Sequence, residues 1–170
     1  KHHVGTQRPR LEIAKHATAA EIRDALGAAH FDKYFSITFV RNPWDLMVSS
    51  YFWWCQHAIR MVGTMHTSAI IRRMTFDEFI RSIYGRYFIN EYHGTVSDWF
   101  AGPGGDLVNY VGTVETLESD FKNICARLEI EPGRLDLPKL NTPQRAPYRD
   151  YYTADTRDMV RHRFQDVIHR

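Results

Sequence analysis

The sequence has few cysteines and no long apolar run. Only two cysteines occur in 170 residues, which is too few for the disulfide framework of a small secreted domain. Cys55 and Cys125 each fall among apolar residues of an expected helix, a pattern that indicates buried free thiols rather than a disulfide or a metal pair. No apolar stretch is long enough to cross a bilayer, and no signal peptide is found. The sequence therefore predicts neither a disulfide-stapled scaffold nor a transmembrane segment.

An excess of one charge sign is also missing. The 22 Lys and Arg residues nearly balance the 20 Asp and Glu residues, so the net charge is only +2, and no dense basic stripe accompanies it. This balance argues against nucleic-acid binding. Hydrophobic residues make up 44% of the chain, which is enough for the core of a folded domain. Since repeats, low-complexity tracts and linkers are absent too, we expect residues 1–170 to form a single domain.

One stretch, residues 35–51, carries the strongest local pattern in the chain. Residues 35–40 are a short aromatic and β-branched run, typical of a strand covered on both faces. Arg41 and Asn42 end this run, and Pro43 suits the first turn of a helix because its missing N–H is not needed there. Apolar residues then recur at helical spacing and predict one buried stripe, made of Val48, Tyr51, Phe52, Cys55 and Ile59.

This strand, turn and helix place Arg41 where the strand ends and Ser49 about two turns into the helix. In open α/β sheets, ligands bind at the carboxyl ends of the strands. A guanidinium at that position, with a hydroxyl and free helix N–H groups nearby, suits a phosphate. The alternative is structural: Arg41 caps the helix or pairs with a surface carboxylate, and Ser49 is a small packing residue.

The segment Arg41-Asn-Pro-Trp-Asp-Leu-Met-Val-Ser49 resembles the 3′-phosphate-binding motif of sulfotransferases that use PAPS (3′-phosphoadenosine 5′-phosphosulfate), above all the carbohydrate type and its bacterial relatives. The resemblance implies that Arg41 and Ser49 bind the 3′-phosphate of the nucleotide. It also implies that PAPS is the co-substrate and 3′,5′-adenosine bisphosphate the product. The fold it implies is a three-layer α/β fold with a mostly parallel central sheet, similar in outline to P-loop kinases.

A second resemblance lies upstream of the strand. Lys15-His16-Ala-Thr-Ala is similar to a stretch of the same family in which a catalytic base lies at or near such a histidine. A base is needed because the acceptor hydroxyl must lose its proton as it attacks sulfur, and histidine exchanges protons near neutrality. His16 is therefore the predicted catalytic base, with Glu12 as a weaker rival and Lys15 as a contact for the sulfonate. The structural alternative is a loop histidine bonded to the backbone.

The C-terminal part contains the other nucleotide contacts that the resemblance implies. A proline-bearing loop at residues 137–151 is similar to one that closes over the nucleotide in the family. By this match Asn141, Thr142 and Arg145 are predicted to bind the cofactor. A surface loop held by its prolines is the alternative.

Two further segments resemble the family without supplying a nucleotide ligand. Residues 111–121 match a strand and helix of the family, but Thr113 stands where the family has a basic residue. No ligand role is therefore assigned to Thr113, and Glu115 is expected to fix the turn. Between residues 87 and 99, three residues are candidates for an acceptor-sugar site or else half-buried packing residues: Tyr92, His93 and Trp99.

The remaining elements follow from periodicity, capping residues and turn residues. By residue range, we expect a capped helix at 18–26, an irregular segment at 61–73, a capped helix at 75–84, a turn at 101–106, a strand at 107–114, a helix at 115–128 and a last helix capped by Thr153, with Ile168 as its final core residue.

The family's lysine-bearing loop for the 5′-phosphosulfate, which follows an N-terminal strand, is not found in this sequence. We expect it upstream of Lys1 or removed from the chain. Its loss is the alternative, and would cripple sulfuryl transfer because positioning and charge stabilisation carry most of such transfers.

Two other functions are weighed against the sulfotransferase. A P-loop kinase-like phosphotransferase would need a Walker lysine loop and a Mg²⁺ carboxylate, and neither is found. A non-catalytic nucleotide- or glycan-binding module would keep Arg41 and Ser49 without the transfer loop. No residue cluster calls for a metal. The expected acceptor is a hydroxyl on a carbohydrate or small molecule, and the expected compartment is a bacterial cytoplasm, with a Golgi lumenal domain as the alternative. The oligomeric state is not predicted.

Overall fold

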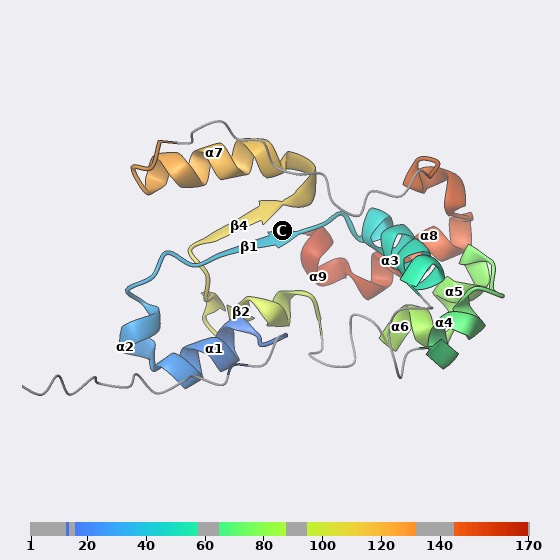
Figure 1. Ribbon diagram of the computed structural model, residues 1–170, viewed down its shortest axis with the longest axis horizontal. Helices are drawn as coiled ribbons and strands as arrows, with labels where there is room; N and C mark the ends of the chain where they lie inside the picture. The colour runs from blue at the N-terminus through green and yellow to red at the C-terminus, as the bar shows by residue number, and fades with distance from the viewer. Residues whose placement is uncertain (1–12, 14–15, 58–64, 88–94, 132–144, 170) are drawn as a thin grey trace, which may run out of the picture.

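The computed structural model of the chain describes residues 13, 16–57, 65–87, 95–131 and 145–169. Figure 1 shows a short parallel sheet with a long helix over it, and a group of helices gathered around the helix that leaves the end of the first strand. The described residues therefore form a mixed α/β structure, as the sequence predicts. No helix among them combines the length and the apolar character needed to span a bilayer.

The parallel sheet consists of strands β1 (Ile37–Val40) and β4 (Tyr110–Thr113), with Val40 opposite Thr113 at the shared end. Because the strands are parallel, the segments that follow them leave from the same edge of the sheet. Both strands are shorter than the ranges expected from the sequence. The prediction that the first strand is covered on both faces is wrong, since the side chain of Ile37 remains 42% exposed.

Helix α7 (Leu117–Arg127) packs on β4 and lies over the sheet in Figure 1. It starts two residues later than predicted, because a 3₁₀ turn at Val114–Thr116 precedes it. Helices α1 (Ala19–Leu26) and α2 (Ala28–Phe31) pack against each other, and α1 also contacts β2 (Ala101–Gly102).

The predicted capping box at the start of α1 is confirmed. The Thr18 hydroxyl accepts from the N–H of Glu21, and the Glu21 carboxylate accepts from the N–H of Thr18 at 2.7 Å. Gly27 ends the helix with a φ of 79°, a conformation that favours glycine over residues with a Cβ. The expected turn at 101–106 is a small hairpin, in which β2 pairs with β3 (Gly105–Asp106).

Helix α3 (Pro43–His57) begins at the predicted proline and forms the axis of the helical group. Its neighbours include helices from the middle and the end of the chain (Figure 1). The other helices of the group are α4 (Met65–Ile71), α5 (Phe76–Arg81), α6 (Ile83–Tyr87), α8 (Ala154–Arg163) and α9 (Gln165–Ile168).

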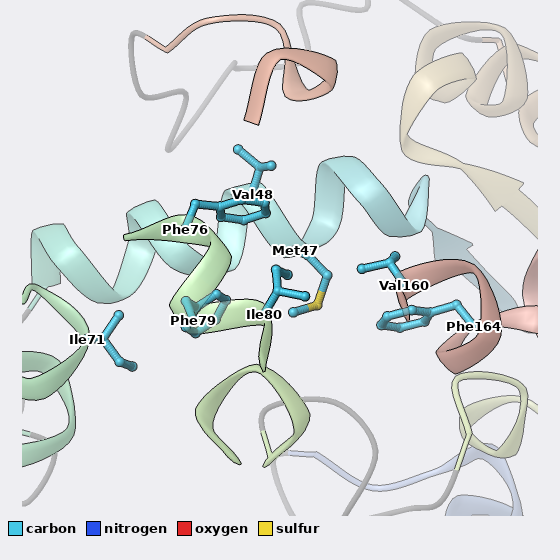
Figure 2. Packing of buried hydrophobic residues seen from close by; sticks show 8 residues of the cluster. All are labelled: Met47, Val48, Ile71, Phe76, Phe79, Ile80, Val160 and Phe164. Carbon is cyan, nitrogen blue, oxygen red and sulfur yellow. The ribbon is translucent and has the colours of Figure 1, made fainter. Parts of the chain in front are cut away.

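The main core fills the space between α3, α4, α5 and α8. Figure 2 shows eight buried apolar side chains that meet there: Met47, Val48, Ile71, Phe76, Phe79, Ile80, Val160 and Phe164. Tyr51, Phe52, Cys55 and Ile168 pack against this core, so the stripe predicted for α3 is confirmed as far as Cys55, and Ile59 lies outside the described residues. The N-caps predicted at Thr75 and Thr153 are confirmed, and each is part of a capping box at the start of α5 or α8.

Two predictions for the helical group are wrong. Residues 65–71 were expected to be irregular, but they form α4, whose Ile71 is fully buried against the core. The single helix expected over 75–84 is broken at Ser82, where the backbone becomes extended. The break lets α6 approach α5 so closely that a methyl group on Gly85 would strike the backbone of Phe79.

Arg163, the last residue of α8, stabilises this break. Its guanidinium donates to the carbonyl oxygens of Gly85 in α6 at 2.8 Å and of Ile80 near the end of α5 at 3.1 Å. Burial lowers the pKa of this arginine. The guanidinium therefore replaces the water that would otherwise satisfy these carbonyl groups.

Candidate functional site

The turn after β1 is held by side chains on both sides. Asn42 donates its backbone N–H to the Glu115 carboxylate at 2.8 Å, which ties the end of β1 to the turn after β4. The Asn42 side-chain oxygen accepts from the backbone N–H groups of Trp44 and Asp45 at 3.1 and 3.3 Å. The role expected for Glu115 in fixing the turn is therefore confirmed, and Asn42 caps α3.

This cap overturns one expectation from the sequence. Free N–H groups at the start of α3 were expected to help hold a phosphate. Pro43 has no N–H, the next two N–H groups donate to the Asn42 side chain, and the N–H of Leu46 donates to the Asn42 carbonyl. An anion at this edge must therefore be held by side chains rather than by the helix N-terminus.

Arg41 and Ser49 are brought together by the turn. Nη1 of Arg41 donates to Oγ of Ser49 at 3.0 Å, although the two residues lie eight positions apart. Nε of Arg41 donates to Oδ2 of Asp45 at 2.7 Å, and Nη2 also contacts that oxygen. Since Asp45 and Ser49 are four residues apart on α3, they share the helix face onto which the Arg41 side chain folds back.

Arg145 reaches the same face from the C-terminal part of the chain. Its Nη2 donates to Oδ1 of Asp45 across a separation of 100 residues, at 2.5 Å. The Arg145 and Asp45 side chains are only 12% and 19% exposed, so this is not a loose surface pair. We call Arg41, Asp45, Ser49 and Arg145 the Arg41 cluster.

The C-terminal segment also contacts the start of α3. The Tyr152 hydroxyl donates to the Trp44 carbonyl at 2.8 Å, and Nε1 of Trp44 donates to the Arg157 carbonyl at 3.0 Å. Burial, with the Asp45 carboxylate nearby, raises the pKa of the Tyr152 hydroxyl above its usual range. Tyr152 therefore remains a donor, and these two bonds keep Arg145 close to α3.

The Arg41 cluster has the chemistry of an anion site. Two guanidiniums and one carboxylate leave one positive charge in excess on a half-buried surface. Nε and Nη2 of Arg41 contact Asp45 and Nη1 contacts Ser49, so two of the five guanidinium N–H groups have no further partner among the described residues. Ser49 accepts from Arg41, and its own hydroxyl proton has no acceptor in the described part of the chain. A phosphate oxygen needs donors of this kind.

The structure also supports part of the structural alternative for Arg41, in which the arginine pairs with a carboxylate. Arg41 pairs with a carboxylate, that of Asp45, as this alternative expected. The pair alone does not account for the bond to Ser49 or for the second arginine at the same carboxylate.

The other predicted site residues lie apart from this cluster or outside the described residues. His16 is exposed, just before the cap of α1, and no hydrogen bond or ion pair joins it to the Arg41 cluster in the described part of the chain. Trp99 is half-buried in a 3₁₀ turn at Ser97–Trp99. Six residues named from the sequence lie outside the described residues: Glu12, Lys15, Tyr92, His93, Asn141 and Thr142.

Asp45 is a residue of this cluster that was not identified from the sequence. Its spacing of four residues from Arg41 and from Ser49 was an available signal. Its contact with Arg145 could not be read from spacing, because it depends on the fold. Within the described ranges, no group of three or more His, Cys, Asp or Glu side chains is placed to hold a metal ion.

Comparison with known proteins shows similarity to one protein family. The model of the sulfotransferase family matches residues 2–168, which is nearly the whole chain. The chain is also similar to an uncharacterized protein of Archaeoglobus fulgidus, with 26% identity over 130 residues that cover 75% of this chain and 93% of that protein. No solved structure matches significantly.

Proposed function

Because the chain belongs to the sulfotransferase family, we propose that it transfers a sulfuryl group from PAPS to the hydroxyl of a carbohydrate or small molecule. The observation that carries the proposal is the hydrogen bond between Arg41 and Ser49 at the end of β1. A family match alone gives the class of reaction. The bonded pair supplies a place where the nucleotide can be recognised.

The residues of the Arg41 cluster fit a phosphate dianion. Arg41 offers its outer N–H groups, Ser49 a hydroxyl proton and Arg145 a second positive charge. We assign these three residues to the 3′-phosphate of the nucleotide. A phosphate with two negative charges fits this cluster better than a neutral ribose hydroxyl, so the site would select a 3′-phosphorylated nucleotide over adenosine 5′-monophosphate. Asn141 and Thr142 are proposed as further nucleotide contacts, on the resemblance alone.

His16 is proposed as the base for the acceptor. In the transfer, the acceptor oxygen forms a bond to sulfur while the bond from sulfur to the bridging phosphate oxygen breaks. The acceptor proton goes to His16, and 3′,5′-adenosine bisphosphate leaves. The 3′-phosphate and the transferred group lie at opposite ends of the ribose, so a base near sulfur is not expected to touch Arg41. The exposed position of His16 before α1 keeps it accessible to an acceptor.

The three-layer, P-loop-kinase-like arrangement remains part of the proposal. The support for it is the parallel pair β1 and β4 with α7 on one side, together with the position of Arg41 at the carboxyl end of a strand.

Calorimetry and a transfer assay test the function directly. We expect the protein to bind 3′,5′-adenosine bisphosphate more tightly than ATP, whereas a kinase-like phosphotransferase would prefer ATP with Mg²⁺. With PAPS labelled in the sulfuryl group, we expect transfer to a hydroxyl acceptor in a panel of sugars and small alcohols. Tight bisphosphate binding without any transfer would instead identify a nucleotide-binding module, and preference for ATP would contradict the proposal.

A further inference from the structure

We propose that Asp45 is a positioning residue of the nucleotide site, whose carboxylate holds the guanidiniums of Arg41 and Arg145 in the orientation that receives the 3′-phosphate. This inference rests on the proposed function of the Arg41 cluster. It assigns a role to an acidic residue at a site for an anion, where a negative charge is unexpected by simple electrostatics.

The two oxygens of Asp45 serve different arginines. Oδ2 accepts from Nε of Arg41 at 2.7 Å, and Oδ1 accepts from Nη2 of Arg145 at 2.5 Å. The Asp45 side chain is 19% exposed and Arg145 12% exposed, so water competes little for these bonds. Asp45 is thus a bridge between the start of α3 and a residue that lies 100 positions later.

The contact with Asp45 also sets the direction of Arg41. A guanidinium is planar, so a carboxylate at its Nε edge fixes the plane of the whole group. With that edge taken by Asp45, Nη1 lies at Ser49 Oγ, and one N–H on each of Nη1 and Nη2 is left without a partner among the described residues. Without the carboxylate, the Arg41 side chain keeps its charge but loses the contact that orients it.

Asp45 also allows the two arginines to lie close together. Two guanidiniums at one small site repel each other, and the repulsion is stronger where the surface is half-buried. The Asp45 carboxylate lies between them and offsets it. Among the described residues, Asp45 is also the only hydrogen-bond acceptor that the Arg145 side chain reaches.

Positioning and simple charge make opposite predictions. If Asp45 were only a negative charge near the bound phosphate, replacing it by Asn would remove a repulsion and tighten binding. If Asp45 positions the two arginines, the same substitution weakens binding, because an amide oxygen cannot accept from both guanidiniums with the strength of a carboxylate. The sign of the change therefore separates the two roles.

The experiment is calorimetric titration of the wild-type chain and of Asp45→Asn with 3′,5′-adenosine bisphosphate and with adenosine 5′-monophosphate. The quantity of interest is the ratio of the two affinities, which isolates the contribution of the 3′-phosphate. We expect Asp45→Asn to lower this ratio by about tenfold, the scale of one hydrogen bond between charged groups. Affinity for the monophosphate should stay near the wild-type value, which also reports that the variant is folded.

Asp77→Asn is the matched control. Asp77 forms a comparable pair four residues from Arg81, with Nε of Arg81 at 2.7 Å, but it lies on α5, and within the described ranges no hydrogen bond or ion pair joins it to the Arg41 cluster. The Asp77→Asn substitution should leave the affinity ratio unchanged. A second test is Asp45→Asn in an Arg41→Ala background, where the loss should be smaller than in the wild type because the group being oriented is gone.

A higher or unchanged ratio in Asp45→Asn would overturn the inference while leaving the proposed function intact, provided that Arg41→Ala still lowers the ratio. A wild type that binds both nucleotides equally would overturn the proposed function and this inference with it. If Asp45→Asn does not fold, Asp45→Glu decides. This substitution keeps the charge but shifts the carboxylate oxygens by one methylene group. A positioning role therefore predicts a lower affinity ratio, whereas a role of charge alone predicts an unchanged affinity ratio.

Discussion

Arg41 and Ser49 are joined by a hydrogen bond of 3.0 Å between Nη1 and Oγ, across a turn that separates the end of β1 from the second turn of α3. The bond depends on three local features: a strand that ends just before Arg41, an Asn42 cap that starts the helix at once, and side chains four residues apart on the same helix face. An arginine and a serine eight residues apart thus act on one small surface.

The first prediction concerns the hydroxyl of this pair. Ser49→Ala removes one donor to the phosphate and one acceptor for Arg41. We expect it to weaken binding of 3′,5′-adenosine bisphosphate by about 1.5–3 kcal/mol, the net scale of a hydrogen bond to a charged group. Titration calorimetry measures the change.

Ser50→Ala is the control for that variant. Ser50 is the next residue of α3, but it is buried and its hydroxyl donates to the Leu46 carbonyl at 2.9 Å. The affinity for the bisphosphate should stay at the wild-type value in this variant. An equal loss in both variants would mean that a small change anywhere in this turn of α3 perturbs the site, and Ser49 would lose its assigned contact.

The second prediction separates catalysis from binding. His16→Ala should lower the rate of sulfuryl transfer by about a hundredfold or more, the lower range for loss of a general base, with bisphosphate affinity nearly unchanged. His30→Ala is the control, since His30 is an exposed histidine of α2 that lies beside Tyr34. A parallel loss of rate and affinity in His16→Ala would indicate a structural role instead.

The third prediction uses the end of α7. Glu129 has a φ of 55°, and the N–H of Ile130 donates to the Cys125 carbonyl at 2.9 Å, the pattern of a helix end that favours glycine. Glu129→Gly should therefore raise the free energy of unfolding by about 0.5–1 kcal/mol.

Glu118→Gly should instead lower the free energy of unfolding. Glu118 lies in the first turn of the same helix, where glycine costs helix stability of about 1 kcal/mol. Urea unfolding followed by circular dichroism measures both variants. If Glu129→Gly destabilises the protein as Glu118→Gly does, the helix does not end in this conformation.

The fourth prediction is a pH dependence. The Thr116 hydroxyl, the Thr113 N–H and the Tyr110 hydroxyl all donate to the Asp120 carboxylate, and they hold the pKa of that group below its usual value. A carboxyl group with a lowered pKa contributes stability above its unfolded pKa, of about 3.9, and loses it as the pH falls through the folded value.

Asp120→Asn should therefore lower the unfolding temperature at about pH 6 and have a smaller effect at about pH 2.5, where the wild-type carboxyl is also becoming protonated. Thermal unfolding at the two pH values checks this. The same difference at both pH values would show that the three bonds to Asp120 do not depend on its charge.

The sequence was most informative where the physics is local. The strand at β1, the start of α3 at Pro43, the capping box at Thr18 and the N-cap at Thr75 depend on neighbours a few residues away, and the structure confirms them. Helix α4 was missed because Gly63 and several small polar residues indicated an irregular segment, whereas burial of Ile71 against the core stabilises the helix.

The site shows the same division. The spacing between Arg41 and Ser49 was visible in the sequence, and so was the position of Asp45, four residues from each of them. The convergence of Arg145 on Asp45 was not, because it requires the C-terminal segment to be held at the start of α3 by Tyr152 and Trp44. The prediction of free helix N–H groups failed because it took no account of the Asn42 side chain as a cap.

The most direct test of the account is the affinity of Arg41→Ala for 3′,5′-adenosine bisphosphate and for adenosine 5′-monophosphate, measured by calorimetry beside the wild type and an Arg81→Ala control. We predict that Arg41→Ala weakens bisphosphate binding by about 1.5–3 kcal/mol, the scale of a hydrogen bond to a charged group, and leaves monophosphate binding nearly unchanged. Arg81→Ala, which removes an exposed ion pair on α5, should change neither affinity. Unchanged bisphosphate affinity in Arg41→Ala would remove Arg41 from the site and contradict the proposed recognition of the 3′-phosphate.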